Sequence, residues 1–359
     1  MSVLVQATSP AKPQLEALVN SPMHLSVVRE NWKYTSVARS LALFEHEATA
    51  AETVVAGTDQ HGVMVDVATA PTDAQMRALI ERASRCPPSA RALLDATSVD
   101  RLVISGTLTN PLQVMRTNAR RPLIIELTAN CAATLDDLAE DSPTGWIHVH
   151  VGPGALLDYS RLRSQRSTSD WQRLVIVLER DATLRINHYA TGAALRRLDA
   201  LIVLTGEGAN VDLSGCWTAS AKEKLDQQWH VEHRAPHTTS RQVHHGIGDG
   251  DATTTFRGRI YIGADCRQAN ADLINRNLAL SASATCNTKP ELEIHNDDVR
   301  CSHGATVGQL PEDSVFYLRS RGFDAETAKR TLAAGFIRSA IRGSLASAAR
   351  IALTGADDA

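Results

Sequence analysis

The chain has 359 residues, with 37 lysines and arginines against 40 aspartates and glutamates, so its formal net charge is −3. This length allows two or three domains with an ample hydrophobic core. The near-balance of charge excludes an extended basic surface for nucleic acid and gives no reason to expect an anionic membrane as a partner. We therefore expect proteins or small molecules as partners.

Six cysteines stand at positions 86, 131, 216, 266, 286 and 301, with no CxxC pair among them. This spacing argues against a disulfide framework and against a zinc ribbon, so we expect free thiols. The first residues lack the basic start and apolar run of a signal peptide, and no stretch approaches eighteen apolar residues. These features predict a cytoplasmic protein.

Residues 1–100 are predicted to be mostly helical. Prolines at positions 10, 13 and 22 interrupt the first segment, and a helical pattern then surrounds Trp32 and Tyr34. A short strand is expected at residues 62–67, before a helix that Thr72 can cap.

Residues 101–308 are predicted to be all-β. Short apolar segments alternate with turns rich in glycine, aspartate and serine, at residues 102–106, 122–127, 146–152, 174–179, 184–189, 201–206 and 260–264. This pattern allows either a β-sandwich or a β-helix.

A weak internal repeat favours the β-helix. Small alanines at positions 155, 182 and 209 follow glycine or aspartate, and each is 27 residues after the one before. Small residues at a fixed period suit stacked turns of a solenoid, in which each turn buries its face against its neighbours. The next similar pair, Asp251 and Ala252, departs from this period, so a sandwich stays possible on these grounds.

Residues 288–322 combine a candidate chemical site with a change of secondary structure. Alternation predicts a strand around residues 291–295 and a second strand at 299–303, joined by an Asn-Asp-Asp turn. On the second strand Cys301 and His303 share one face, with backbones roughly 6 to 7 Å apart. Thiolate and imidazole suit iron or zinc, but two ligands are too few for a closed site. The alternative is an inert buried cysteine beside a hydrogen-bonded core histidine.

Residues 309–359 are predicted to be helical. Pro311 marks a helix start and Gly322 suits its end in the left-handed conformation. Asp324 can cap a second amphipathic segment, which reaches about residue 354. Its apolar stripe either packs on the core or binds a partner.

Four motifs resemble one known family, the SufB/SufD scaffold proteins of iron-sulfur cluster assembly. They are KPELEI at residues 289–294, DDV at 297–299, CSHGATVGQL at 301–310 and, before them, NRNLALS at 275–281. The sequences AAGF at 333–336 and ENWKYT at 30–35 are similar to further family segments. The match is nearest to SufD, because SufB subunits carry an acid-His-acid version before ATV.

This resemblance implies a right-handed parallel β-helix core at residues 101–308, with an N-terminal helical region at 1–100 and a C-terminal helical domain at 309–359. It implies a non-catalytic scaffold subunit that pairs with a SufB-type subunit and docks the SufC ATPase. Cys301 and His303 match positions at the interface where a transient iron-sulfur cluster, shared with the partner, would be built. The ATPase would dock on the C-terminal helices, with Phe316, Leu332, Phe336 and Ile337 as candidate contacts.

Several alternatives remain at this stage. Histidines at 230, 233, 237, 244 and 245 invite a stand-alone metal-binding module, although His230 and His233 should point to opposite faces of a strand. A β-helix enzyme acting on carbohydrate is less favoured, since it is usually secreted. The sequence does not distinguish a hetero-oligomer from a homodimer, or show whether a reduced flavin takes part.

Overall fold

The protein is described by a computed structural model, which covers residues 52–58, 63–69, 99–117, 122–138, 144–164 and 169–355. Most of the region predicted to be helical, residues 1–100, lies outside the described residues. The strand predicted at 62–67 is confirmed as β2, and an unpredicted strand, β1, precedes it.

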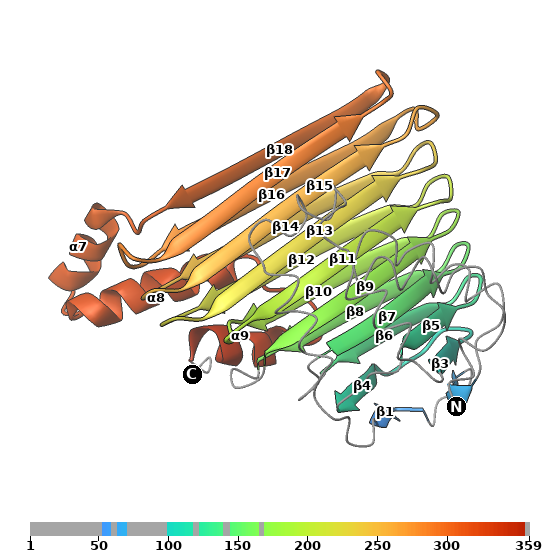
Figure 1. Cartoon of the computed structure of the whole chain (residues 1–359), viewed down its shortest axis with the longest axis horizontal. Helices are drawn as coiled ribbons and strands as arrows, with labels where there is room; N and C mark the ends of the chain where they lie inside the picture. The colour runs from blue at the N-terminus through green and yellow to red at the C-terminus, as the bar shows by residue number, and fades with distance from the viewer. Residues whose placement is uncertain are drawn as a thin grey trace, which may run out of the picture.

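The described strands form two long sheets that face each other along the molecule (Figure 1). Sheet A contains, in spatial order, β1 Glu52–Ala56, β4 Leu112–Thr117, β6 Ala132–Asp137, β8 Leu156–Arg163, β10 Thr183–Thr191, β12 Asn210–Ala219, β14 Thr239–Gly248, β16 Ala269–Ala279 and β18 Val299–Gly308. Sheet B contains β2 Val63–Thr69, β3 Val99–Ile104, β5 Leu123–Leu127, β7 Thr144–Val151, β9 Asp170–Leu178, β11 Arg196–Leu204, β13 Lys224–His233, β15 Thr253–Ile262 and β17 Thr285–Ile294.

From β3 onward the chain crosses from one sheet to the other after each strand, which makes a parallel β-helix of about six turns. Neighbouring strands within a sheet are parallel, except where β1 meets β4 and β2 meets β3 at the first end. The predicted β-helix is therefore confirmed, and the sandwich alternative is wrong.

The repeat of 27 residues is one turn of this helix, because Leu156, Thr183 and Asn210 are register partners. The alanine before each of them is buried, and the residue before each alanine has a positive φ. The same left-handed position recurs in the later turns, and the full series is Asn130, Gly154, Asp181, Gly208, His237 and Gln268. Asp251 and Ala252 do not continue it, since they lie in the turn before β15, on the other side of the helix.

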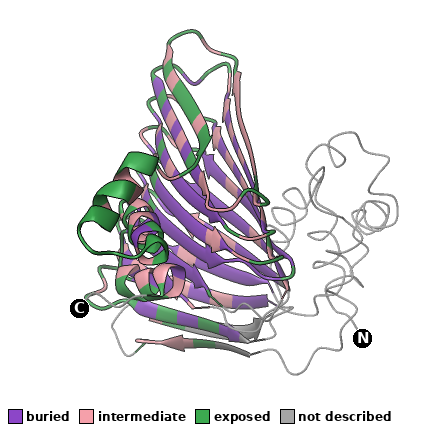
Figure 2. Ribbon diagram, turned by 90° about the vertical axis from the view of Figure 1, so that its left-hand side faces the viewer, coloured by how far each residue is buried: buried purple, intermediate pink, exposed green. Residues whose placement is uncertain are grey.

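Alternate residues of both sheets point inward and form one continuous hydrophobic core. The strands in the middle of the β-helix are accordingly buried along most of their length (Figure 2). Buried valine, leucine and isoleucine dominate the turns from β3 to β11. Inward positions from β8 onward also carry polar or aromatic side chains, such as Tyr159, Gln227 and His244, all of which are buried.

Three helices follow the last strand: α7 Glu312–Ser320, α8 Ala325–Arg338 and α9 Ala346–Thr354. Gly322 has a φ of +96° after α7, and the Asp324 side chain accepts a hydrogen bond from Thr327 N at 2.8 Å at the start of α8, as predicted. The single helical segment predicted up to residue 354 is wrong, because the chain leaves the helix between α8 and α9.

Hydrogen bonds to sheet A explain this break. The backbone N–H of Arg342 donates to Tyr189 Oη at 2.7 Å, and the Ser214 hydroxyl donates to the Ala340 carbonyl. Gly343, with a φ of +78°, passes so close to β10 that a Cβ there would lie 2.3 Å from Asn187 Nδ2. The segment between α8 and α9 is thus fixed to the outer face of sheet A.

Candidate functional site

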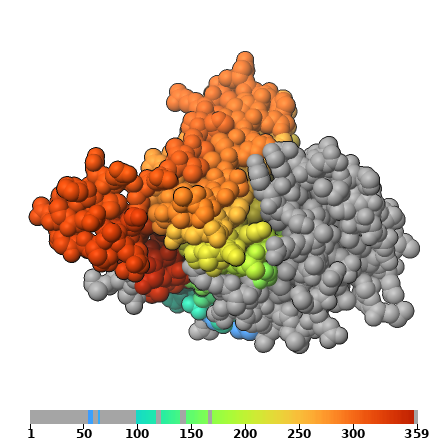
Figure 3. Space-filling view, turned by 60° about the vertical axis from the view of Figure 1, so that its left-hand side comes forward, coloured from blue at the N-terminus to red at the C-terminus, as the bar shows by residue number. Residues whose placement is uncertain are grey.

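Strands β17 and β18 form the last turn, and each pairs on one side only in the part of the chain that is described. Their side chains are half-buried or exposed, in contrast to the buried strands below them. Ile294 and Val307 are 39% and 47% exposed. The last turn projects from the molecule beside the C-terminal helices (Figure 3), so this end of the β-helix has a partly uncovered core.

Cys301 and His303 lie on the inward face of this open end. Their register partners on β16 are Ala271 and Leu273, which belong to the core. Cys301 itself packs against that core and is half-buried, whereas His303 is exposed. Partial burial raises the pKa of the Cys301 thiol. The predicted shared face of the two residues is confirmed, on a strand that extends to Gly308.

A buried polar group lies further along β16, where Asn275 is the register partner of Ala305. Asn275 Oδ1 accepts hydrogen bonds from Thr288 Oγ1 at 2.7 Å and from Asn277 Nδ2 at 2.6 Å. Residues 275–281 were recognised in the sequence as a family motif, but no role was predicted for Asn275 or Asn277. Their alternation, two residues apart on a strand, was the available signal that both point inward.

Ion pairs cover the outer face of β17. Glu291 pairs with Arg257 and, at 3.1 Å, with Lys289, while Glu293 pairs with Arg259. Partial burial alone would raise the pKa of Glu291, but the hydrogen bond and charge of Arg257, helped by Lys289, hold it below its usual value. The edge strand therefore presents a charged outer face and a less polar inner face.

The five clustered histidines do not converge. His233 is buried between the hydroxyls of Thr238 and Ser240, and His244 is buried inside the core, while His230 points outward as predicted. His237 lies in a turn and His245 faces α8. Among the described residues no group of three or more histidine, cysteine or acidic side chains could hold a metal ion. This gives the stand-alone metal module no support.

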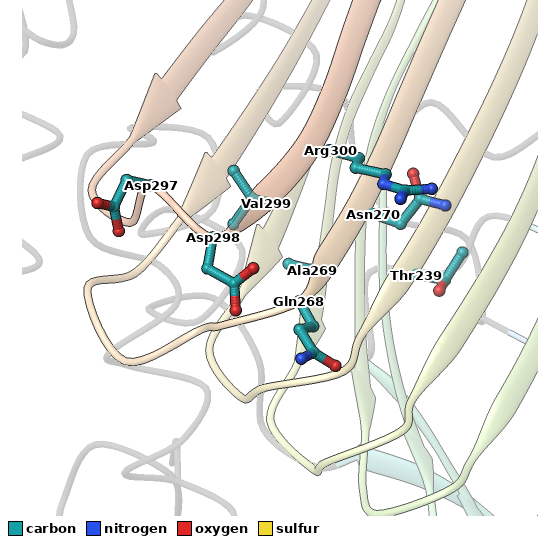
Figure 4. Close-up of a pocket in the computed structure, with 8 residues that line it drawn as sticks. All are labelled: Thr239, Gln268, Ala269, Asn270, Asp297, Asp298, Val299 and Arg300. Atoms are coloured by element: carbon teal, nitrogen blue, oxygen red, sulfur yellow. The ribbon is translucent and has the colours of Figure 1, made fainter.

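A polar hollow of about 530 Å³ adjoins the final turn (Figure 4). Its lining includes the carboxylates of Asp297 and Asp298 and the guanidinium of Arg300, which is the register partner of Asn270. The backbone N–H of Gln268 donates to the Asp298 carbonyl at 2.6 Å, which continues the stacked turns up to this edge. Two carboxylates beside an arginine do not make a metal site, and we assign none.

A second groove, also of about 530 Å³, lies between α7 and the end of β16. Leu280, Leu310 and Phe316 contribute its apolar lining, with Arg319 and Lys329 among its polar residues. The Phe316 side chain is 72% exposed. This groove offers an apolar anchor site with cationic groups beside it.

The other candidate contacts lie on α8. Leu332 is half-buried, Phe336 stacks on His245 of β14, and Ile337 is completely buried against sheet A. Ile337 therefore belongs to the contact between α8 and the sheet, and only Phe316 among the four is largely exposed. Apolar residues spaced three and four apart on a helix predict that one face is apolar, but they do not show whether that face packs on the core or is exposed to a partner.

Comparison with known proteins adds to this description. The family model for the SufBD core domain of the SUF system for FeS cluster assembly matches residues 114–336. No helix in the described part of the chain has the length and apolar character needed to span a membrane.

Three curated relatives show the extent of similarity. The iron-sulfur cluster assembly protein SufD of Escherichia coli is 32% identical over 189 residues, which cover 52% of this chain and 45% of that protein. A SufBD family protein of Synechocystis is 32% identical over 191 residues, covering 52% and 42%, and the chloroplastic protein ABCI7 of Arabidopsis thaliana is 31% identical over 192 residues, covering 53% and 40%. The matched segments thus span less than half of each relative.

Proposed function

Because this chain belongs to the SufBD family of iron-sulfur cluster assembly proteins, we propose that it is a non-catalytic scaffold subunit of the SufD type. It would pair with a SufB-type subunit and dock a SufC-type ATPase, and a new cluster would be built where the subunits meet. The cluster is the cargo of this assembly and leaves it.

The open end carries this proposal. A solenoid buries each turn against the next, so a last turn with exposed Ile294 and Val307 needs a cover. Strands β17 and β18 also keep one unpaired edge each within the described residues, and such edges readily pair with strands of another chain. A homologous β-helix would satisfy both requirements.

Cys301 and His303 support a cluster site at the same interface. Both lie on the inward face of β18, so they would face a second solenoid placed on the open end. Thiolate and imidazole are iron ligands, and the partner would supply the ligands that this chain lacks.

The groove beside α7 supports the docking of an ATPase. Exposed Phe316 can anchor an apolar side chain of the partner, and Arg319 and Lys329 can meet acidic groups beside it.

Anaerobic co-purification tests the proposal. The tagged chain is mixed with the SufB and SufC counterparts of its host, and the mass and iron content of the eluted complex are measured. We expect a complex with both partners. Val307→Asp should prevent pairing at the open end, whereas Arg185→Asp, an exposed control on the outer face of β10, should not. A chain that binds neither partner, or that forms only homodimers, contradicts the proposal.

A further inference from the structure

The buried side-chain amides of Asn275 and Asn277 connect three strands. Asn275 Oδ1, on β16, is the shared acceptor for Thr288 of β17 and Asn277 of β16. The amide of Asn277 also donates to the Thr306 carbonyl of β18 at 3.2 Å. Asn275 Oδ1 is therefore linked to both strands of the last turn.

The same asparagine is fixed from below. Its Nδ2 donates to the backbone carbonyl of His244 on β14 at 3.3 Å, and its side chain is completely buried. Buried hydrogen bonds are directional and costly to leave unmade, so they define the separation of the groups that they join.

The last turn needs such a link more than the others. Lower turns are held by apolar contacts with a turn on either side, whereas within the described part of the chain β17 and β18 have a neighbouring turn on one side only. Apolar contacts alone leave the distance between these two strands poorly defined, since they are not directional.

We infer that Asn275 is a positioning residue for the open end. Its amide oxygen sets the separation of β17 and β18, and through β18 the direction in which Cys301 and His303 face the partner subunit. This inference rests on the proposed pairing of the open end with a second solenoid.

Another amide in the same interior provides a matched control. Gln242 on β14 is also completely buried, but neither its oxygen nor its nitrogen has a hydrogen-bond partner. Replacing it by leucine removes a buried amide without breaking a bridge between strands. A generic effect of altering the polar interior would appear in both variants, and a positioning effect only at Asn275.

The experiment compares Asn275→Leu, Asn275→Asp and Gln242→Leu by hydrogen exchange in the free chain and by affinity for the SufB-type subunit. Asn275→Leu should speed exchange in β17 and β18, and weaken the affinity, by at least about tenfold each, because all three buried hydrogen bonds of the Asn275 side chain are lost. Exchange in β9 to β13 should stay unchanged. Asn275→Asp keeps an acceptor oxygen but replaces the donor to the His244 carbonyl by a second carboxylate oxygen and buries a charge, so it should restore neither property.

If Asn275→Leu does not fold, Thr288→Val replaces it in the experiment. This variant removes only the hydrogen-bond donor on β17, so it should speed exchange in that strand alone. A uniform rise in exchange along the whole solenoid, or an equal effect of Gln242→Leu, overturns the inference. If the unmodified chain does not bind the SufB-type subunit, the proposed pairing fails, and the exchange pattern alone still decides whether Asn275 orders the open end.

Discussion

The imidazole of His245 and the ring of Phe336 stack with centroids 4.5 Å apart and planes only 11° from parallel. His245 Nδ1 also lies 2.9 Å from the carbonyl oxygen of Phe336. One histidine on β14 thus holds both the side chain and the backbone near the end of α8, where helix carbonyls lack partners within the helix.

Replacing Phe336 by Asp should release α8 from sheet A, because the carboxylate would replace the stacked ring at a half-buried position. Stability should fall by several kcal/mol, and proteolysis should begin between α8 and α9. Thermal unfolding and limited digestion measure this. A double-mutant cycle with His245→Ala should give a coupling of about 0.5 to 1.5 kcal/mol, and a coupling of zero would mean that the stacking does not hold the helix.

Replacing Phe316 by Asp should instead leave the fold intact, since its side chain is largely exposed on α7. The affinity for the ATPase partner should fall by about tenfold or more, as for the loss of an interface anchor. Ile351→Asp is the control, because Ile351 is also exposed, at 47%, but lies on α9 away from the groove. Unchanged binding by Phe316→Asp in a titration would exclude this groove as the docking site.

His303→Ala should reduce cluster formation on the assembled complex while leaving the fold of this exposed position intact. Cys301→Ala should act in the same direction, and less if thiols of the partner substitute. If both residues serve only as core, each change lowers stability by about 1 to 3 kcal/mol, and cluster yield falls only in proportion to folded protein. Cluster absorbance and thermal unfolding of the same anaerobic samples separate the two cases, with His295→Ala as the exposed control.

Acid should destabilise the β-helix through its buried histidines. Burial lowers the pKa of His233 to about 4 and of His244 to about 3, and burial beside Arg161 lowers that of His188 well below its usual value. Below about pH 6.5 the unfolded chain therefore binds protons that the folded chain excludes. The stability that depends on these neutral histidines is fully present above that pH. As the pH falls towards about 4, the free energy of unfolding decreases by at most about 1.4 kcal/mol per pH unit for each histidine.

Chemical denaturation at several pH values between about 4.5 and 7.5 measures how the free energy of unfolding depends on pH. His244→Phe should flatten the slope, since His244 lies among the rings of Trp217, Trp229 and Phe256. Gln242→Leu, which changes a completely buried side chain of the same interior but removes no titratable group, should leave it unchanged. An identical slope in both variants would assign the acid sensitivity to other groups.

Gly208→Ala should destabilise one turn of the helix for two reasons. Gly208 has a φ of +74°, and an added Cβ would lie 2.3 Å from Asp181 Oδ1 of the turn below. Gly106→Ala is the matched control, since Gly106 has a φ of +75° but no atom within 4 Å of that Cβ. The left-handed backbone alone should cost each alanine variant about 1 to 2 kcal/mol of stability. Gly208→Ala should lose more stability than Gly106→Ala, because only its Cβ meets another side chain. Equal losses in the two variants would show that Asp181 moves aside freely.

The repeat and the apolar strands could be predicted because they depend on local rules. Small residues every 27 positions and alternating apolar residues indicate stacked turns wherever the chain goes. The strands with polar inward residues were harder to predict. Residues 224–233 and 239–248 form β13 and β14, although their inward positions include Gln227, Gln242 and His244, which are residue types usually found at the surface.

The 27-residue repeat favoured a β-helix over a sandwich before the structure was known. Local patterns predicted the strand that carries Cys301 and His303 on one face and the start of α8 at Asp324, because strand alternation and helix capping depend on neighbours a few residues away. The folded chain was needed to show that Phe336 stacks on the sheet, that Ile337 is core, and that Asn275 is linked to the last two strands. Phe336 and His245 are 91 residues apart, and Tyr189 and Arg342 are 153 apart. Contacts over such separations depend on how the turns stack and where the helices return, and no local pattern encodes them.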